Sequence, residues 1–510
     1  MAETYDIIVI GAGLGGLCAA FEASRSGRKV LLLERHNLPG GFATSFVRGR
    51  FEFEPSLHEM PDIPSIEEAT GVVRYLLDDA ALDIDFVPIP DAYRVILTEK
   101  GVDVRMPFGV QPFIDRVERE VPGSRASVEA YMSLCREVQD TFGYLSDHEK
   151  DLDYRELLAG YGNFIRTGSY TAEQVADALA LPKAARDIIY PYWCYLGVPT
   201  DRMSFSIWAA LLNSYISGGA VIPRHRSHEI SSAFLKKIMD NGAEVRFNTR
   251  VERVEVSGGK VTGVLTSSGG KYSCRSLIAN VSPTLMFDSL ISPPSRVPAE
   301  ARKSIAARKH GFSLVVVYLG LDKSPDDLGL GDYSYFIAPH MDTDRLYRKI
   351  YDLECDGIMQ ASVCLNIANP ECSPPGTTIL ALTAGFRAEA WNGVRPEEYF
   401  RTKNAVALKL ITQFEKATGT RIREHIEEIE VATPQTFARY TGAYNGIVYG
   451  YEPEPWDSIV PRAMSADRES YFSNLQFCGG FAYRCHGYGS SILSGKTAAE
   501  KTIQALDGDL

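Results

Sequence analysis

The sequence predicts an α/β fold of two units: a unit with a parallel sheet, and an α+β unit with a helical segment. Three observations predict it. A strand–turn–helix–strand pattern fills the first 34 residues, helical spacing dominates residues 111–215, and residues 311–320 and 357–386 are strand-like. The 510 residues allow two to four domains' worth of core, and 45% apolar with 23% charged residues is ordinary for a soluble globular protein.

The first element is an apolar run from Tyr5 to Ile10 that ends in the stretch GAGLGG at residues 11–16. Apolar residues then recur at helical spacing, and Gly27 is a natural stop for that helix. A second apolar strand, Val30 to Leu33, is closed by an acid, Glu34. Strand, glycine turn, helix, second strand and terminal acid therefore follow in the order typical of a dinucleotide-binding unit of the Rossmann type.

Each part of this unit has a physical task. Gly11 permits a tight turn, Gly13 lets the backbone approach a pyrophosphate, and Gly16 lets helix and strand pack closely. The phosphates would lie on the unpaired amides at the helix N-terminus, where the helix dipole favours negative charge. Glu34 is placed to accept hydrogen bonds from ribose hydroxyls and would repel a 2′-phosphate.

Separate blocks then resemble one large FAD-binding family, which includes amine oxidases, phytoene desaturases, carotenoid isomerases and retinol saturases. "RHNLPGGFATSF" (35–46) resembles its GGxxxS/T element, and "FEFEPSLHEM" (51–60) resembles the FxFDxGxH stretch of carotenoid isomerases and retinol saturases. "GAEVRFNTRVERVEVSGGKVTGV" (242–264) and "LIANVSP" (277–283) are similar to its middle segment. "TPQTFARYTGAYNGIVYG" (433–450) and "NLQFCGGFAYRCHGYGSSILSGKTAAEKTI" (474–503) resemble its closing blocks.

The resemblance implies FAD as the cofactor, rather than NAD alone. It implies a glutathione-reductase-like FAD-binding domain from residues 1–100, 216–290 and 465–510, with residues 101–215 and 291–464 forming a substrate-binding domain. The residues expected to contact FAD are Gly11, Ala12, Gly13, Leu14, Gly15, Gly16, Glu34, Arg35, Gly40, Gly41, Ser45, Val251, Gly479, Gly480, Gly489 and Ser490.

The intervening segments carry their own local signals. "SVEAYMSLCREVQDTF" (127–142) places apolar residues three and four apart, as in an amphipathic helix. "TAEQVADALALP" begins with a capping box made by Thr171 and Gln174. Residues 311–320 and 357–386 are strand-like, and a helix is expected from about Pro396 to Gly419. A sheet and helices covering a flavin would suit a deep apolar substrate tunnel.

One basic stretch needs an explanation in an otherwise acidic chain: Arg224, His225, Arg226 and His228 fall within five positions. The block resembles the YPxGGxxxI segment near the substrate face of the flavin, with His225 and Arg226 in place of the glycine pair. Three readings stay open. The side chains turn to water or to nearby acids, the two arginines bind an anionic substrate group, or a histidine exchanges protons with the substrate.

Further candidates come from the resembling blocks. His58, His225 and Tyr449 are the candidate catalytic residues, and Arg224, Arg226, Tyr440, His486 and Tyr488 are the candidate substrate-binding residues. Cys485 beside His486 is either a reactive pair or ordinary packing. The nine cysteines contain no CxxC pair and the nine histidines no HExxH, so we expect neither a disulfide framework nor a metal.

Charge and hydropathy limit the partners. A formal charge of −12 argues against nucleic acid. No apolar run is long enough to span a bilayer and no basic leader precedes the first strand, which predicts a cytoplasmic protein and leaves peripheral membrane contact and oligomeric state open.

The resemblance implies an FAD-dependent oxidoreductase that transfers hydride to or from carbon–carbon bonds of an apolar, conjugated lipid or polyene, with an anionic head group if the two arginines bind one. Two alternatives remain: a non-redox cis–trans isomerase that uses reduced FAD, and a non-catalytic protein that binds prenylated partners, of the escort type.

Overall fold

A computed structural model describes residues 3–61, 71–147, 153–465, 471–482 and 486–508. Its first sheet has the strand order β10-β2-β1-β13-β12-β11-β14, and β20 also pairs with β13. The bounds are β1 Glu3–Ile10, β2 Val30–Leu33, β10 Glu244–Arg246, β11 Val251–Ser257, β12 Lys260–Thr266, β13 Lys271–Ala279, β14 Ile291–Ser292 and β20 Leu475–Phe477.

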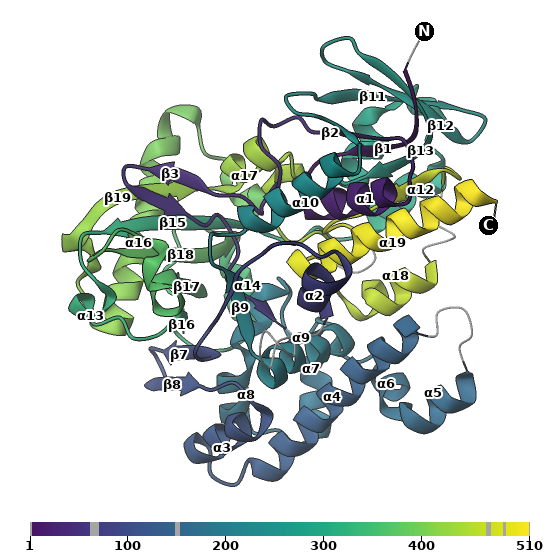
Figure 1. The fold of residues 1–510 in the computed structure, drawn as a ribbon. Helices are drawn as coiled ribbons and strands as arrows, with labels where there is room; N and C mark the ends of the chain where they lie inside the picture. The colour runs from purple at the N-terminus through teal and green to yellow at the C-terminus, as the bar shows by residue number, and fades with distance from the viewer. Residues whose placement is uncertain (1–2, 62–70, 148–152, 466–470, 483–485, 509–510) are drawn as a thin grey trace.

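The centre of this first sheet is parallel. β1 pairs in parallel with both β2 and β13, and all four residues of β2 are buried, which explains their unbroken apolar character. Helices α1 (Leu14–Arg25), α10 (His228–Asp240) and α19 (Tyr488–Asp507) pack together against the sheet (Figure 1). The predicted Rossmann-type unit is therefore confirmed, although its last helix comes from near the opposite end of the chain.

The second sheet has the order β19-β15-β18-β17-β16-β7-β8. Its bounds are β7 Tyr93–Leu97, β8 Val102–Met106, β15 Ser313–Leu321, β16 Ser334–Ala338, β17 Gln360–Cys364, β18 Thr378–Phe386 and β19 Ile426–Ala432. β15 is buried along its whole length because α16 (Tyr399–Thr418) covers one face and a large aromatic core covers the other. β7 pairs in this sheet although it lies within residues 1–100, and β14 pairs in the first sheet although it lies beyond residue 290.

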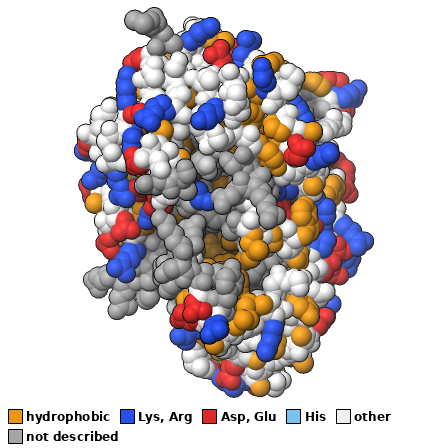
Figure 2. Space-filling view, turned by 90° about the vertical axis from the view of Figure 1, so that its right-hand side faces the viewer, with side chains coloured by type: hydrophobic (Ala, Val, Ile, Leu, Met, Phe, Trp, Pro, Cys, Tyr) orange, Lys and Arg blue, Asp and Glu red, His pale blue; other side chains and the backbone are white. Residues whose placement is uncertain are grey.

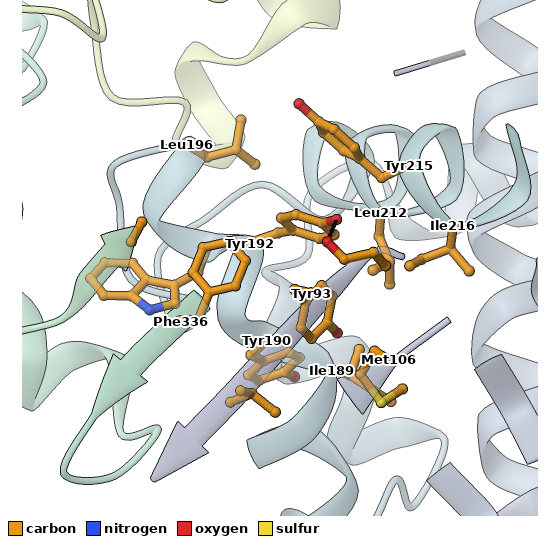
Figure 3. Close-up of a cluster of buried hydrophobic side chains, with 14 of the residues drawn as sticks. Tyr93, Met106, Ile189, Tyr190, Tyr192, Leu196, Leu212, Tyr215, Ile216 and Phe336 are labelled. Carbon is orange, nitrogen blue, oxygen red and sulfur yellow. Dashed lines mark hydrogen bonds between the residues drawn. The ribbon is translucent and has the colours of Figure 1, made fainter. Parts of the chain in front are cut away.

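The helical segment follows the sequence expectation. It contains α3 Val110–Glu120, α4 Arg125–Asp147, α5 Tyr154–Gly160, α6 Gly162–Thr167, α7 Ala172–Ala178, α8 Lys183–Ile189 and α9 Phe205–Gly218. The Thr171–Gln174 capping box is present. Packing joins these helices to the second sheet through aromatic side chains: the Tyr192 ring stacks on Tyr215 with centroids 4.7 Å apart and meets Phe336 edge-on (Figure 3).

Short elements connect the two sheets. A hairpin pairs β3 (Phe46–Arg48) with β4 (Phe51–Phe53), and a small sheet joins β5 (Met60–Pro61), β6 (Phe86–Pro88) and β9 (Ala220–Pro223). The remaining helices are α2 Gly71–Arg74, α11 Pro283–Leu285, α12 Ala299–Ala307, α13 Pro325–Leu328, α14 Thr343–Lys349, α15 Leu365–Ala368, α17 Pro434–Thr441 and α18 Ile459–Ser465. Among the described helices, none combines the length and hydropathy needed to cross a bilayer.

Candidate functional site

The glycine turn after β1 is packed too closely for any larger residue. Gly11 has φ of 91°, and a Cβ built on Gly16 would lie 1.9 Å from the Gly11 carbonyl oxygen. A Cβ on Gly13 would lie 2.6 Å from Nδ2 of Asn280, the residue that follows β13. The three glycines thus allow the turn, the helix and the next strand end to meet, as the sequence predicted.

Two helix N-termini converge on one cavity. α1 begins after Gly13 and α19 after Gly487, and neither has a side-chain cap. The two helices pack through Gly15 and Gly495, since a Cβ on Gly495 would lie 2.1 Å from the Gly15 carbonyl oxygen. Uncapped amides at the positive end of a helix dipole bind phosphate readily. The donor set therefore fits the diphosphate of a dinucleotide.

Glu34 lies beside the glycine turn, directly after β2. Its Oε2 accepts a hydrogen bond from the Ala12 N–H at 2.6 Å, and its Oε1 accepts one from the His36 N–H at 2.8 Å. Two backbone donors hold the carboxylate on the cavity wall. The neighbouring Arg35 also lines the cavity, with its guanidinium donating to the Ala438 carbonyl at 3.2 Å.

The structure brings most of the predicted cofactor residues together. Ala12 and Gly16 pack behind the turn, and the other fourteen line the cavity: Gly11, Gly13, Leu14, Gly15, Glu34, Arg35, Gly40, Gly41, Ser45, Val251, Gly479, Gly480, Gly489 and Ser490. Ser45 points its hydroxyl at Glu52, which accepts at 2.6 Å. Sequence reasoning missed Asn280, whose amide fits between Gly13 and Gly479; its place just after a parallel strand was the available signal.

The cavity has a volume of about 1730 Å³ and continues past the cofactor residues. It exceeds the roughly 300–1,000 Å³ of a pocket for one small ligand, so it has room for a second molecule. Its further part is bounded by β15, β17 and β18 of the second sheet and by α4 and α9. Figure 2 shows a face that is hollowed near its centre, with hydrophobic side chains gathered beside the hollow.

The wall of this further part is mainly aromatic and aliphatic. The aromatic residues that line it are Phe142, Tyr195, Tyr215, Phe312, Tyr318, Phe437, Tyr449 and Tyr488. Tyr440 lines the cavity at its outer end, with 52% of its surface exposed. Such walls suit an elongated apolar molecule, because aromatic rings supply contact area without charge.

A polar chain crosses the wall near His58. The Tyr195 hydroxyl donates to Oε1 of Glu59 at 3.0 Å and lies 3.2 Å from Nδ1 of His58, and Nε2 of His58 lies 3.4 Å from the Thr383 hydroxyl. Burial lowers the pKa of His58 to about 4 and raises the pKa of Glu59 to about 8. At neutral pH the histidine is therefore uncharged and the glutamate holds its proton.

His486 and Tyr488 also line the cavity. Nε2 of His486 lies 3.0 Å from the Tyr195 carbonyl, and its ring packs on Tyr449 with centroids 4.7 Å apart. Burial lowers the pKa of His486 to about 4 despite that hydrogen bond. The Tyr488 hydroxyl donates to the Phe42 carbonyl at 2.9 Å. Cys485, the other half of the predicted pair, lies outside the described residues.

The basic stretch is not part of the cavity wall. Arg224 pairs with Asp85 at the surface, the side chain of His225 is exposed, and His228 lies 3.6 Å from Glu52. Arg226 is 6% exposed, and its guanidinium donates to the backbone carbonyls of Glu52 and Cys372.

The geometry therefore does not support the anion clamp or His225 as a proton carrier, and it favours pairing with acids and backbone. Arg226 keeps a left-handed backbone, φ 76°, where the family pattern has glycine. That conformation turns its side chain inward to the carbonyls instead of toward the cavity.

No metal site accompanies this cavity in the part of the chain that the structure describes, where three or more His, Cys, Asp or Glu side chains nowhere gather as ligands. The eight cysteines described are free. Fold and cavity together define a dinucleotide-binding flavoenzyme. The donor set at the two helix ends, the glycine contacts and the size of the cavity all fit FAD.

Comparison with known families agrees. The family described as FAD dependent oxidoreductase matches residues 6–282, more than half of the chain. The chain belongs to this family: it is an FAD-dependent oxidoreductase. The motif resemblance noted in the sequence is thereby confirmed.

Individual relatives have low sequence identity to this chain but align with most of its length. The chain is 24% identical to all-trans-retinol 13,14-reductase of Macaca fascicularis, over 95% of this chain and 83% of the relative. It is 25% identical to prolycopene isomerase 2 of an Oncidium hybrid, over 91% and 77%. Among solved structures, it resembles an oxidoreductase from Methanosarcina mazei (TM-score 0.62, 16% identity, 98% and 100% covered) and cyclohexylamine oxidase from Brevibacterium oxydans (0.61, 15%, 99% and 99%).

Proposed function

We propose that this enzyme transfers hydride to or from a carbon–carbon bond of an apolar or amphipathic polyene or lipid, and that residues 1–100, 216–290 and 465–510 form mainly the cofactor part. One observation carries the proposal: a single cavity runs from the glycine turn of α1 to an aromatic wall between the second sheet and helices α4 and α9. The curated relatives, a retinol reductase and a prolycopene isomerase, have names that match such a substrate.

The residues of the chain have separate tasks in this reaction. The amides of Gly13, Gly15 and Gly489 hold the diphosphate, Glu34 holds the ribose, and Asn280 fills the space between the two glycine loops. FAD supplies the exchange of hydride. The aromatic wall aligns the carbon chain against the reacting group and excludes water from it.

The structure gives less reason than the sequence to expect a negatively charged head group on the substrate. Arg224 and Arg226 were the argument for an acidic head, and neither lines the cavity. The cations that do line it are Arg35, Arg48, Arg250, Lys403 and Arg439. Arg35 and Arg250 adjoin the cofactor residues Glu34 and Val251, Arg439 adjoins Tyr440, and Arg48 pairs with Glu430. A neutral or weakly polar head group therefore fits the aromatic part better.

The direct test uses purified, FAD-loaded protein reduced under anaerobic conditions. All-trans-retinol is added in stoichiometric amount, and the visible spectrum and the extracted retinoids are followed together. The proposal expects the flavin absorption to return while a dihydroretinol forms in equal amount. An apolar C40 polyene is tested in parallel. The proposal would be contradicted if the flavin stayed reduced and both substrates were recovered unchanged.

A non-redox isomerase remains the second candidate because one group of relatives carries that name. The two activities differ in electron balance. Isomerisation of prolycopene by the reduced enzyme would continue over many turnovers without an electron donor and without reoxidation of the flavin. A hydride-transferring enzyme would stop after one turnover under the same conditions.

We also propose peripheral contact of an otherwise cytoplasmic protein with neutral lipid, from which an apolar substrate would enter. Leu158 on α5, Ile165 on α6 and Met464 on α18 are exposed by 60%, 45% and 79%. These three helices lie at the right-hand side of Figure 1, the side that faces the viewer in Figure 2. The net charge of −12 disfavours an anionic surface. Co-sedimentation with phosphatidylcholine vesicles should fall for Leu158→Glu combined with Met464→Glu; an unchanged bound fraction would contradict the contact.

A further inference from the structure

We propose that Glu59 is the proton-transfer residue of the cavity, the group that gives one proton to the substrate carbon opposite the one that receives hydride. This inference rests on the proposed function and extends it by naming the acid. Glu59 was not among the candidates from the sequence. It follows His58 directly, lines the cavity, and comes from the loop between β4 and β5.

The hydrogen bonding of Glu59 indicates that its carboxyl group is neutral. Tyr195 donates to Oε1 at 3.0 Å, so Oε1 serves as an acceptor. Oε2 is buried and has no hydrogen-bond partner among the described residues. An ionised carboxylate oxygen in that position would lack any donor, which costs several kcal/mol in a dry site. The carboxyl group is therefore neutral.

The surroundings of Glu59 contain acids and neutral groups rather than cations. The titratable side chains near it are His58, Tyr192, Cys194, Tyr195, Tyr215 and Tyr333. Within the described chain, no lysine or arginine forms an ion pair with it. Burial, the largest cause, raises the pKa of Glu59 to about 8, and the Tyr195 hydrogen bond opposes the rise.

His58 and Glu54 are poorer acids for this step. Burial keeps the pKa of His58 at about 4, so His58 carries no transferable proton of an imidazolium at neutral pH. Glu54 has a pKa raised to about 7 by burial, but both its oxygens accept hydrogen bonds. Those donors are the N–H and hydroxyl of Ser227 and the N–H groups of Ser56 and Leu57, and Glu54 does not line the main cavity.

The balance of the reaction is simple in the direction of saturation. One carbon of the double bond receives a hydride, with its two electrons, from the reduced cofactor, which is left oxidised. The other carbon receives H⁺ as the O–H bond of Glu59 breaks and a C–H bond forms. The carboxylate is reprotonated from solvent after the product has left the cavity. In the reverse direction the same carboxylate would accept the proton, and only after it had been ionised at higher pH.

Infrared spectroscopy of the FAD-loaded enzyme tests the acid without substrate. The carbonyl stretch of a neutral carboxylic acid should be present at pH 7 and fade as the pH passes about 8. The Glu59→Gln variant should lack this band, and its spectrum should not change in that region between the two pH values. Glu22→Gln is the matched control, because Glu22 is also buried but pairs with Arg25 and lies outside the cavity. A signal that is unchanged by Glu59→Gln would overturn the assignment.

A second variant keeps the test independent of how well Glu59→Gln folds. Tyr195→Phe removes the hydrogen bond that lowers the pKa of Glu59, so the infrared titration midpoint should move upward. An unmoved midpoint would mean that the titrating acid is another residue.

Kinetics with all-trans-retinol and reduced enzyme complete the test. Glu59→Gln should lower kcat roughly 100-fold or more and abolish the decline of wild-type kcat above pH 8, while the flavin spectrum stays unchanged. Wild-type rates in the variant would overturn the role of Glu59 and leave the proposed function intact. If the wild type itself turns over no polyene, the proposed function fails, whereas the infrared result still decides whether Glu59 holds the proton.

Discussion

The carboxylate of Glu34 accepts a hydrogen bond from the backbone N–H of Ala12 at 2.6 Å. The acid that ends β2 is thereby fixed to the turn that ends β1, although 22 positions separate them. Since the same carboxylate also accepts from His36, its orientation is set before any cofactor binds. Preorganisation of this kind lowers the cost of binding a sugar hydroxyl.

Glu34→Gln should therefore raise the dissociation constant for FAD roughly tenfold or more, because a charged acceptor is lost and one backbone donor is left poorly paired. Titration of apoprotein with FAD, followed by flavin fluorescence, measures the change. Glu255→Gln, on an exposed position of β11, is the control. Equal dissociation constants for the two variants would show that Glu34 does not hold the ribose.

Gly16→Ala should disrupt the N-terminal unit. The added Cβ would lie 1.9 Å from the Gly11 carbonyl, a backbone atom that a rotamer change cannot move aside. Gly143 lies in α4 with open space around its Cα, so Gly143→Ala should be neutral or stabilise by up to about 1 kcal/mol. Thermal melting and the FAD content of purified protein compare the two. Similar melting temperatures would contradict the packing described for the turn.

Arg226→Ala should reduce stability while leaving the KM for substrate unchanged. Its guanidinium joins the carbonyls of Glu52 and Cys372, and truncation would remove the donor from one buried and one part-buried acceptor, at a cost of roughly 1–3 kcal/mol. Arg224→Ala, at the exposed pair with Asp85, should have little effect. Chemical denaturation and steady-state kinetics separate the two properties. A KM raised tenfold in Arg226→Ala at full stability would restore the anion clamp.

His486 should make folding stability depend on acid pH. Burial lowers its pKa from 6.5 to about 4, so between these pH values the unfolded chain binds a proton that the folded chain does not. Its contribution to stability is complete above pH 6.5 and is lost as the pH falls toward 4, by about 1 kcal/mol per pH unit. The difference in unfolding free energy between wild type and His486→Gln should shrink accordingly. A difference that is constant with pH would refute the burial of a neutral ring.

Ala210→Trp should shorten the cavity where α9 faces it. Ala210 lines the wall together with Leu211, Ser214 and Phe142. An indole there would occupy the space that we assign to the substrate tail, so the KM for all-trans-retinol should rise roughly tenfold or more while FAD content is unaffected. Ala130→Trp, on the exposed face of α4, is the control. Equal KM values would place the substrate elsewhere.

Local patterns were enough to predict the cofactor part. The strand, the glycine turn and Glu34 lie within one short stretch, and each residue acts on near neighbours, so spacing alone carries the information. The helices of residues 111–215 and the capping box at Thr171 were predictable for the same reason. β7 was assigned to the first unit because the sequence gives no sign of its true partner. It pairs with β16, which lies more than 200 positions further along the chain.

The misassigned and missed residues have a common physical cause. Arg226 looked like a substrate ligand because the sequence does not reveal its left-handed backbone, which turns the side chain toward carbonyls of distant segments. Asn280 and Glu59 gain their positions from contacts with Gly479 and Tyr195, each more than 130 positions away. A single sequence gives no local sign of such contacts.

The pairing of α1 with α19 has a consequence for biosynthesis. Gly15 and Gly495 are in contact although nearly the whole chain separates them in sequence. A nascent polypeptide that has been synthesised only as far as the second sheet therefore has the phosphate-binding turn of α1 but still lacks α19. Flavin loading is therefore a late event, completed only after translation has passed α19. A ribosome that stalls before that helix releases a chain that cannot retain the vitamin-derived cofactor.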